Sequence, residues 1–289
     1  MIAARRSRPS ARFSIARLLV PSAVAALVSL AACRGSDAPA TTARAQTPAS
    51  AATTNGPIPP AEVVIARPSG RYQADSVVGG GSITGSVSTA APLQAGAAAP
   101  TGRDSALCGP SIPDESVSQQ GNALAGAVVW LDGIRRGKPL PIERRLELES
   151  DHCKLAPRVQ GAVVGSAVNV IGHDDFRQHL HFLAGGERER RATVLLGRDE
   201  QVIPTERPFL APGLVIVRDA DHPWPTAYIA VFDHPYFAVT AANGTFTIDA
   251  VPAGRYTVKV WHERTAVMEQ VVDVAPRAGA RVTVVVRGK

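Results

Sequence analysis

The sequence predicts an all-β protein, in which the strands form one large or two small sandwich or barrel domains. Short segments, most of them rich in β-branched residues, recur after about residue 81 and are bounded by Gly, Pro or charged residues, as is typical of strands in sandwiches and barrels. Almost none of this region shows the 3.6-residue apolar period of a helix. The clearest expected strands cover residues 83–87, 124–131, 192–196, 214–217 and 281–286.

A tight turn is expected at Asn243-Gly244, between two apolar segments, because both residue types tolerate the positive φ of a hairpin turn. Side chains alternate between the two faces of a strand, so one set of apolar residues in the flanking segments should share an inward face. That set is Phe246, Ile248, Tyr256, Val258 and Val260.

Residues 1–32 have the features of a secretory signal. Five arginines precede the apolar run 18–30, which is too short to span a bilayer stably, and small residues follow it. The tripeptide Leu-Ala-Ala before Cys33 resembles the bacterial lipobox, in which the Cys is lipidated and becomes the mature N-terminus. The alternative is an ordinary signal with an incidental Cys. Because Arg34 stands where an Asp would retain a lipoprotein at the inner membrane, we expect the periplasmic face of the outer membrane.

Removal of the leader leaves a nearly neutral chain. Five of the 31 Lys and Arg residues lie in it and none of the 25 Asp and Glu residues do, so 26 basic residues face 25 acidic ones afterwards. No basic stripe remains to favour nucleic acid as a partner.

Residues 33–81 are dominated by Ala, Thr, Ser, Pro and Gly. Such a composition cannot bury enough apolar surface to offset the entropy of ordering, so we expect a flexible tether. Within it, residues 63–65 could form a short strand added to the domain.

The remaining two cysteines form an even pair if Cys33 is lipidated. A disulfide between Cys108 and Cys153 would close a loop of about 45 residues and contribute roughly 4 kcal/mol on the chain-entropy model. The alternative is that one of these cysteines is a thiolate ligand or nucleophile. Neither Cys lies in a Cys-x-x-Cys motif, but His152 beside Cys153 is compatible with this alternative.

A series of short motifs follows in a specific order along the second half of the chain. Cys-x-x-x-Pro begins at Cys153, Gly165 precedes a strand, and Asp175 and His179 match an Asn-x-Asp-x-x-x-His pattern in which His173 replaces the Asn. This order resembles the cupredoxin-like domains of exported bacterial proteins. Further blocks begin at His222, His234, Asn243, Val251 and Val260, and they pass into a sequence that resembles a carboxypeptidase regulatory-like module.

The resemblance covers roughly residues 105–289 and implies both fold and domain order. It implies a cupredoxin-like Greek-key sandwich over residues 82–232, followed by a small transthyretin-like, carboxypeptidase regulatory-like sandwich over residues 233–289. In the carboxypeptidase family this module is an accessory domain without the zinc site of the catalytic domain, so the resemblance implies no peptidase activity.

Segment 219–225 stands where a blue-copper protein carries its Cys-x-x-His-x-x-Met loop. His222 matches the imidazole of that loop, and His179 or His181 matches the other imidazole ligand. However, Asp219 occupies the thiolate position and Pro225 the thioether position. Since a type 1 copper centre needs the thiolate, electron transfer by such a centre is not expected.

Two interpretations of these residues stay open. The imidazoles of His179, His181 and His222 with the Asp219 carboxylate offer N and O ligands suited to Cu(II) or Zn, which would make a copper-binding or electron-transfer protein. The alternative, which we favour, is a domain that has lost its metal and keeps the histidines for hydrogen bonding. The loop 173–175 is expected to be simply polar, although it could add to a metal site.

Other polar and aromatic residues fit structural roles. His234 and His262 fit satisfied buried groups better than ligands. Trp224, between two prolines, fits either an aromatic surface for a sugar or protein partner or a packed loop anchor. The alternating charges of residues 187–191 fit a solvated hairpin end.

Sequence signals for an enzyme are lacking. There is no His-Glu-x-x-His or Gly-x-Ser-x-Gly, and glycines 79–81 lead into an expected strand and not a helix, so they form no phosphate-binding loop. The sequence therefore predicts a lipid-anchored, non-catalytic binding or scaffolding protein of the cell envelope. No cofactor is expected, with copper as the alternative. The expected partners are the membrane, through the lipid, and an envelope protein or a carbohydrate.

Overall fold

The computed structural model describes residues 71–206 and 209–289. The predicted signal 1–32, the lipidation site Cys33 and the tether up to residue 70, with its segment 63–65, lie outside the described residues. The described part is all-β, as predicted, with strands β1 to β22 and a single short α-helix among its elements. In these two ranges no helix is long and apolar enough to cross a membrane.

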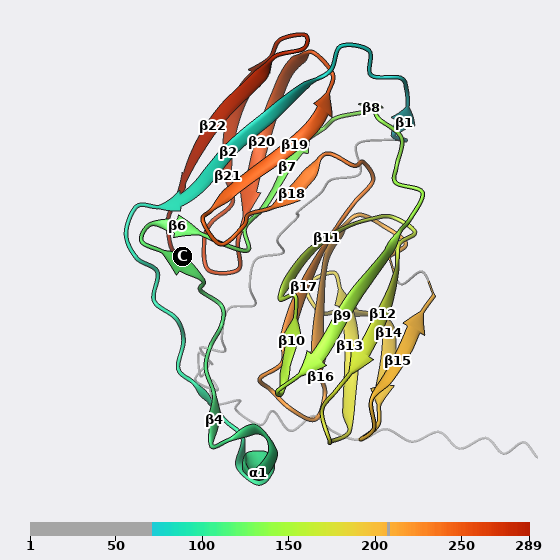
Figure 1. The fold of residues 1–289 in the computed structure, drawn as a ribbon, viewed down its shortest axis with the longest axis vertical. Coiled ribbons are helices and arrows are strands. Elements are labelled where there is room, and N and C mark those ends of the chain that lie inside the picture. The colour runs from blue at the N-terminus through green and yellow to red at the C-terminus, as the bar shows by residue number, and fades with distance from the viewer. Residues whose placement is uncertain (1–70, 207–208) are drawn as a thin grey trace, which may run out of the picture. The chain divides into compact units, whose positions relative to one another are not determined.

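Residues 145–232 form a complete β-sandwich, which we call the inserted sandwich (Figure 1). One sheet has the strand order β10-β9-β12-β15 and the other β11-β17-β16-β13-β14. Their bounds are β9 Arg145–Asp151, β10 Lys154–Ala156, β11 Val159–Val163, β12 Ala167–Gly172, β13 Gln178–Ala184, β14 Glu189–Leu196, β15 Gln201–Thr205, β16 Gly213–Asp219 and β17 Thr226–Phe232.

Along the strands of the inserted sandwich, buried side chains alternate with more exposed ones, and the buried side chains form its core. Leu180 and Phe182 of β13 and Val217 of β16 are fully buried, whereas their strand neighbours are more exposed. Burying each such side chain contributes about 1.5 to 3 kcal/mol. The same alternation fixes which residues at the strand ends face inward, and this decides the geometry of the candidate site.

Strands from both ends of the described chain form the second sandwich, which we call the split sandwich. One sheet has the order β18-β7-β20-β21, and the other has β19-β2-β6-β5 with β22 on β2. Figure 1 shows β2, in blue-green, among the orange and red strands. The bounds are β2 Gly81–Thr89, β5 Gln119–Gln120, β6 Ala123–Leu124, β7 Val128–Asp132, β18 Phe237–Val239, β19 Thr245–Val251, β20 Gly254–Trp261, β21 Met268–Val274 and β22 Gly279–Val286.

The strand pairing differs from the predicted domain boundaries. We expected residues 82–232 to form one domain and residues 233–289 the next, but β2 pairs with β19 and β22, and β7 pairs with β20. Segment 145–232 is therefore inserted into the split sandwich between β7 and β18. The reason is that a strand sequence reveals its buried face but not its partner, and here the partners lie far away along the chain.

The expected tight turn and the inward face are present, but the turn joins β18 and β19, which lie in different sheets, so it is not a hairpin turn. Phe246, Ile248, Val258 and Val260 are buried in the split-sandwich core, and Tyr256 packs against it partly buried. Gly244 carries the positive φ of the turn, +76°, and a Cβ there would come within 2.6 Å of the Val87 carbonyl oxygen. The turn therefore requires glycine at this position.

Short elements complete the described chain. Strand β1 (Gln73–Ala74) pairs in parallel with β8 (Arg136–Gly137), and β3 (Ala99–Pro100) pairs with β4 (Ser111–Ile112). A 3-10 turn at Gly102–Asp104 leads into helix α1 (Ser105–Cys108). The predicted disulfide between Cys108 and Cys153 is confirmed, so it links α1 to the β9–β10 turn. Because both sulfurs are bonded, the alternative thiolate role of these cysteines is wrong.

Candidate functional site

The loop in the copper-site position lies at one end of the inserted sandwich. Strand β16 ends at Asp219, which stands opposite Leu180 of β13, and segment 220–225 leads on into β17. Asp219 continues the inward series of Val215 and Val217, so its carboxylate points into the protein and its side chain is completely buried. A buried carboxylate needs partners for both oxygens, since an unpaired buried charge is costly.

Both oxygens of Asp219 have such partners. Oδ1 accepts the backbone N–H groups of His179 and Asp221, each at 3.0 Å. Oδ2 lies 2.5 Å from Nδ1 of His222, and because a carboxylate only accepts, the ring nitrogen carries the proton. Asp219 thereby fixes the start of the loop and the orientation of the His222 ring.

His222 is itself enclosed, with 5% of its surface exposed. Its ring lies edge-on to Phe176, with centroids 4.9 Å apart, and 5.1 Å from the ring of Trp224. The second ring nitrogen, Nε2, faces Oδ2 of Asp104 at 3.5 Å. The imidazole therefore lies between two carboxylates and two aromatic rings.

His179 and His181 do not converge on this pair. They alternate with the core residues Gln178, Leu180 and Phe182 along β13, so their side chains share the opposite, more exposed face of the sheet. Nδ1 of His179 pairs with Oδ2 of Asp221 at 3.0 Å. Burial, with Arg190 and His179 nearby, lowers the pKa of His181, which favours its neutral form.

These residues do not fit a copper or zinc ion. Two ligand atoms that share one metal lie about 2 Å from it and hence roughly 3 Å or more from each other, whereas Nδ1 of His222 and Oδ2 of Asp219 are 2.5 Å apart. Over residues 71–206 and 209–289, no three His, Cys, Asp or Glu side chains form a group that could hold a metal ion. The four candidates His179, His181, His222 and Asp219 thus divide into an inner pair and an outer pair.

The loop 173–175 has a structural role through Asp174. Its Oδ1 accepts the N–H of Cys153 at 2.9 Å, and its Oδ2 accepts the hydroxyl of Ser150 at 2.9 Å. His173 lies 3.8 Å from Glu200, on the side of β15. The loop therefore supports the disulfide turn and does not join His222.

The other histidines and Trp224 are also packed groups. His234 and His262 are buried, and the Nδ1 atom of each accepts a backbone N–H two residues later, from Tyr236 and Arg264. Trp224 packs against His222 and near Phe176, which fits the loop anchor.

Sequence reasoning missed Asp104, whose carboxylate faces His222. It lies in the 3-10 turn before α1, far along the chain from the loop that it contacts, and no motif marks it. The only available signal is its nearness to Cys108, which the disulfide holds beside the same end of the inserted sandwich. Neither a family pattern nor spacing could pair it with His222.

Comparison with known sequences gives a family match for part of the chain. Residues 213–287 match the sequence model of the Carboxypeptidase regulatory-like domain, a region that begins with β16 and β17 of the inserted sandwich and continues through β18 to β22. No curated protein matches the chain.

The solved structures similar to the chain include copper proteins. The Cu-containing nitrite reductase from Thermus scotoductus SA-01 is 20% identical, with a TM-score of 0.27, over 36% of this chain and 24% of that one. Amicyanin from Paracoccus versutus is 14% identical, with a TM-score of 0.26, over 32% and 85%. A purple cupredoxin from Nitrosopumilus maritimus is 12% identical, with a TM-score of 0.25, over 30% and 99%. The chain thus spans about a quarter of the nitrite reductase.

Proposed function

We propose that the protein is a lipid-anchored, non-catalytic binding or scaffolding protein of the cell envelope, in which loop 219–225 is a structural element and not a copper site. The observation that carries this proposal is the buried contact of 2.5 Å between Asp219 and His222. It occupies the ring nitrogen and the carboxylate oxygen that a metal would need. In this proposal the loop binds no metal. Instead, His222 contacts Asp104, which precedes α1, and the loop helps to hold that segment in place.

The sequence of the leader supports the anchored location. Arginines, a short apolar run and Leu-Ala-Ala before Cys33 together fit lipidation at that Cys, and Arg34 fits the periplasmic face of the outer membrane. The Ala, Thr, Ser and Pro composition that follows fits a tether between the lipid and the folded part.

Copper titration tests the loss of the metal site. We expect the purified full chain to show no intense visible band with Cu(II), because that band requires copper bonded to thiolate and both described cysteines are in a disulfide. Weak nitrogen and oxygen binding, if detected, should involve exposed histidines and fall in His179→Ala. An intense blue band, or one tightly bound copper per chain that is lost in His222→Ala, would overturn the proposal and restore electron transfer.

Cell fractionation tests the anchor. Cys33→Ser should move the protein out of the membrane fraction, because it removes the lipidated thiol. Ser36→Ala, three residues later, is the control and should leave the protein membrane-bound. Arg34→Asp should shift it to the inner membrane. A wild-type chain whose N-terminus carries no lipid by mass spectrometry would contradict the anchored location.

A further inference from the structure

The loop between β8 and β9 presents a bare isoleucine to solvent. The exposed fraction of Ile142 is 102%, the highest among the large apolar residues of the described chain, whose other exposed members range from 38% to 86%. A single exposed apolar side chain is ordinary on a protein surface. What distinguishes Ile142 is the stiff loop that carries it and the positive charge around it.

The loop is held in one conformation. Pro139 and Pro141 fix the φ angle at two of its residues. Nε of Arg144 donates to the carbonyl oxygen of Pro141 at 2.9 Å and closes the turn around Ile142. The end of the loop is fixed by the N–H of Ala167, which donates to the carbonyl oxygen of Arg144 at 2.7 Å. A tip that is already ordered loses little conformational entropy when a partner covers it.

Positive charge lies next to the apolar tip. The loop and the turn before β12 line one open hollow of about 730 Å³. The loop residues in its lining are Leu140, Ile142, Glu143, Arg144 and Arg145. In the described part of the chain the two arginines hydrogen-bond to neutral groups, Arg144 to a carbonyl oxygen and Arg145 to the amide oxygen of Asn169 at 2.9 Å. Their charges therefore remain available to an anionic partner.

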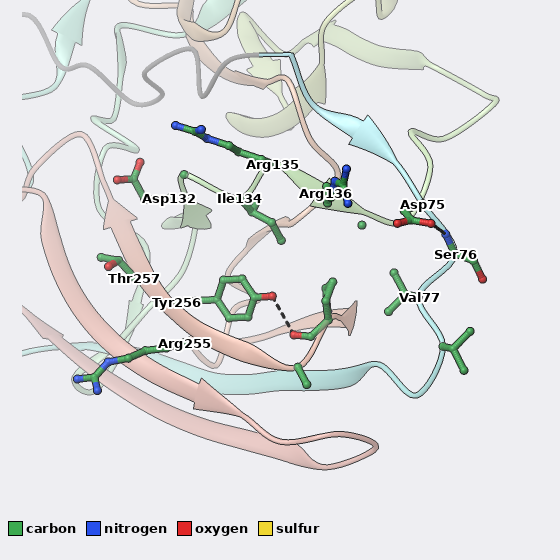
Figure 2. Close-up of a pocket in the computed structure, with 15 residues that line it drawn as sticks. Asp75, Ser76, Val77, Asp132, Ile134, Arg135, Arg136, Arg255, Tyr256 and Thr257 are labelled. Carbon is green, nitrogen blue, oxygen red and sulfur yellow. Dashed lines mark hydrogen bonds between the residues drawn. The ribbon is translucent and has the colours of Figure 1, made fainter.

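The segment before the tip adds further basic residues. Arg135, Arg136 and Lys138 precede the loop, and Figure 2 shows the guanidinium group of Arg135 directed away from Tyr256, which packs against the split-sandwich core. Residues 135–145 carry five basic side chains and one acidic one, whereas the chain without its leader is nearly neutral. The positive charge is thus concentrated around this loop.

The described chain begins beside the same loop. Strand β1 pairs with β8, and the hydroxyl of Tyr72 donates to the carbonyl oxygen of Lys138 at 2.6 Å. Four residues along the chain separate Lys138 from Ile142, so the two lie at most about 14 Å apart. A chain that is anchored through Cys33 therefore reaches the folded part on the side that carries the apolar tip.

We propose that loop 138–145 contacts an anionic lipid bilayer, with Ile142 inserted between the headgroups and the arginines near the lipid phosphates. Burial of apolar side chains in the interface and attraction of cations to an anionic surface each contribute to such binding. A free phosphate ion would leave Ile142 exposed, whereas a bilayer covers it. The inference rests on the proposed function, in which Cys33 is lipidated, and it adds a second membrane contact that orients the folded part.

Vesicle sedimentation tests this contact with residues 34–289, which contain both sandwiches and are made without leader or lipid. The protein should bind vesicles that contain about one third phosphatidylglycerol and bind pure phosphatidylcholine vesicles much less. Raising NaCl to about 0.5 M should release it, because salt screens the attraction. Ile142→Ser should lower the partition coefficient about 10-fold. The double variant Arg144→Gln and Arg145→Gln should lower it about 30-fold.

Matched variants at the opposite end of the chain are the controls. Val285→Ser removes another exposed apolar side chain, and Arg281→Gln with Arg287→Gln removes two exposed arginines. Both should bind anionic vesicles as the wild type does, and circular dichroism establishes that each variant is folded. Equal losses in the loop variants and in these controls would overturn the loop contact, as would a wild type that does not bind anionic vesicles.

A fluorescent label at the tip measures insertion directly. Bimane attached to Ile142→Cys labels one position in residues 34–289, because Cys108 and Cys153 are bonded to each other. Lipids with brominated acyl chains should quench this label and leave the same label on Val285→Cys unquenched. An unquenched label at residue 142, or release of the protein by free glycerol phosphate at the concentration of the lipid, would contradict insertion. Mass spectrometry of the wild-type N-terminus tests lipidation separately, so failure of the loop contact is distinguishable from failure of the anchor.

Discussion

Lowering the pH from 6.5 to 4 is expected to remove roughly 5 kcal/mol from the free energy of unfolding, because two buried histidines resist protonation in the folded state. His234 and His262 are each 3% exposed. Burial lowers the pKa of His234 to about 4, against the opposing effect of Asp233 and Asp132. Burial, with Arg158, Lys289 and Arg264 nearby, lowers the pKa of His262 to about 4 as well.

The direction follows from the protons that each state binds. Well above pH 6.5 both histidines are neutral in the folded and the unfolded chain, so they contribute no pH dependence. Between pH 6.5 and 4 the unfolded chain binds more protons at these two histidines than the folded chain does, and each histidine costs about 2.5 kcal/mol over this interval. Since domains of this kind are stable by about 5 to 15 kcal/mol, unfolding in mild acid is expected.

Urea unfolding, followed by tryptophan fluorescence between pH 7 and pH 4, measures this effect. The double variant His234→Asn and His262→Asn should lose most of the dependence, because Asn does not titrate and its Oδ1 can accept an N–H two residues later. Asn243 already does so toward Thr245, at 3.1 Å. The control is His152→Asn, whose side chain is 85% exposed. Stability that stays constant in the wild type from pH 6.5 to 4 would contradict the pKa assignment.

The strands could be predicted from the sequence, but their partners could not. Alternation of apolar residues is local, so the inward faces around Phe246 and Val258 could be inferred from a few neighbours. Pairing is not local, because β2 and β22 join opposite ends of the described chain. The insertion of residues 145–232 into the split sandwich is a consequence of such pairing, and this is why the predicted boundary at residue 232 differs from the structure.

For the candidate site too, the sequence predicts which face of a strand a residue lies on, but not all of the contacts that it makes. Two histidines that flank the core residue Leu180 must lie on the face opposite to it, so alternation alone separates His179 and His181 from an inward Asp219. The disulfide could be predicted because two cysteines, an even number, remain when Cys33 is assigned to lipidation. The contact of Asp104 with His222 could not be predicted, because it depends on where the disulfide places α1.

Asp219→Ala is expected to destabilise the protein by about 5 kcal/mol, since it breaks the buried hydrogen bond between a carboxylate and His222 and also removes the acceptor for two backbone N–H groups. Urea unfolding at pH 7 measures the loss. Asp221→Ala is the matched control: it removes the carboxylate that pairs with Nδ1 of His179, but both side chains of that pair are about two fifths exposed, so the change should stay below about 1 kcal/mol.

Asp219→Asn separates the two contributions of this carboxylate. Its carbonyl oxygen can still accept the N–H groups of His179 and Asp221, but its amide nitrogen donates toward the protonated Nδ1 of His222, so the loss should fall between those of the other two variants. If instead Asp219→Ala unfolds within 1 kcal/mol of the wild type, packing by Phe176 and Trp224 alone holds His222. The carboxylate would then not be the structural replacement for a metal, and the loop would need another explanation.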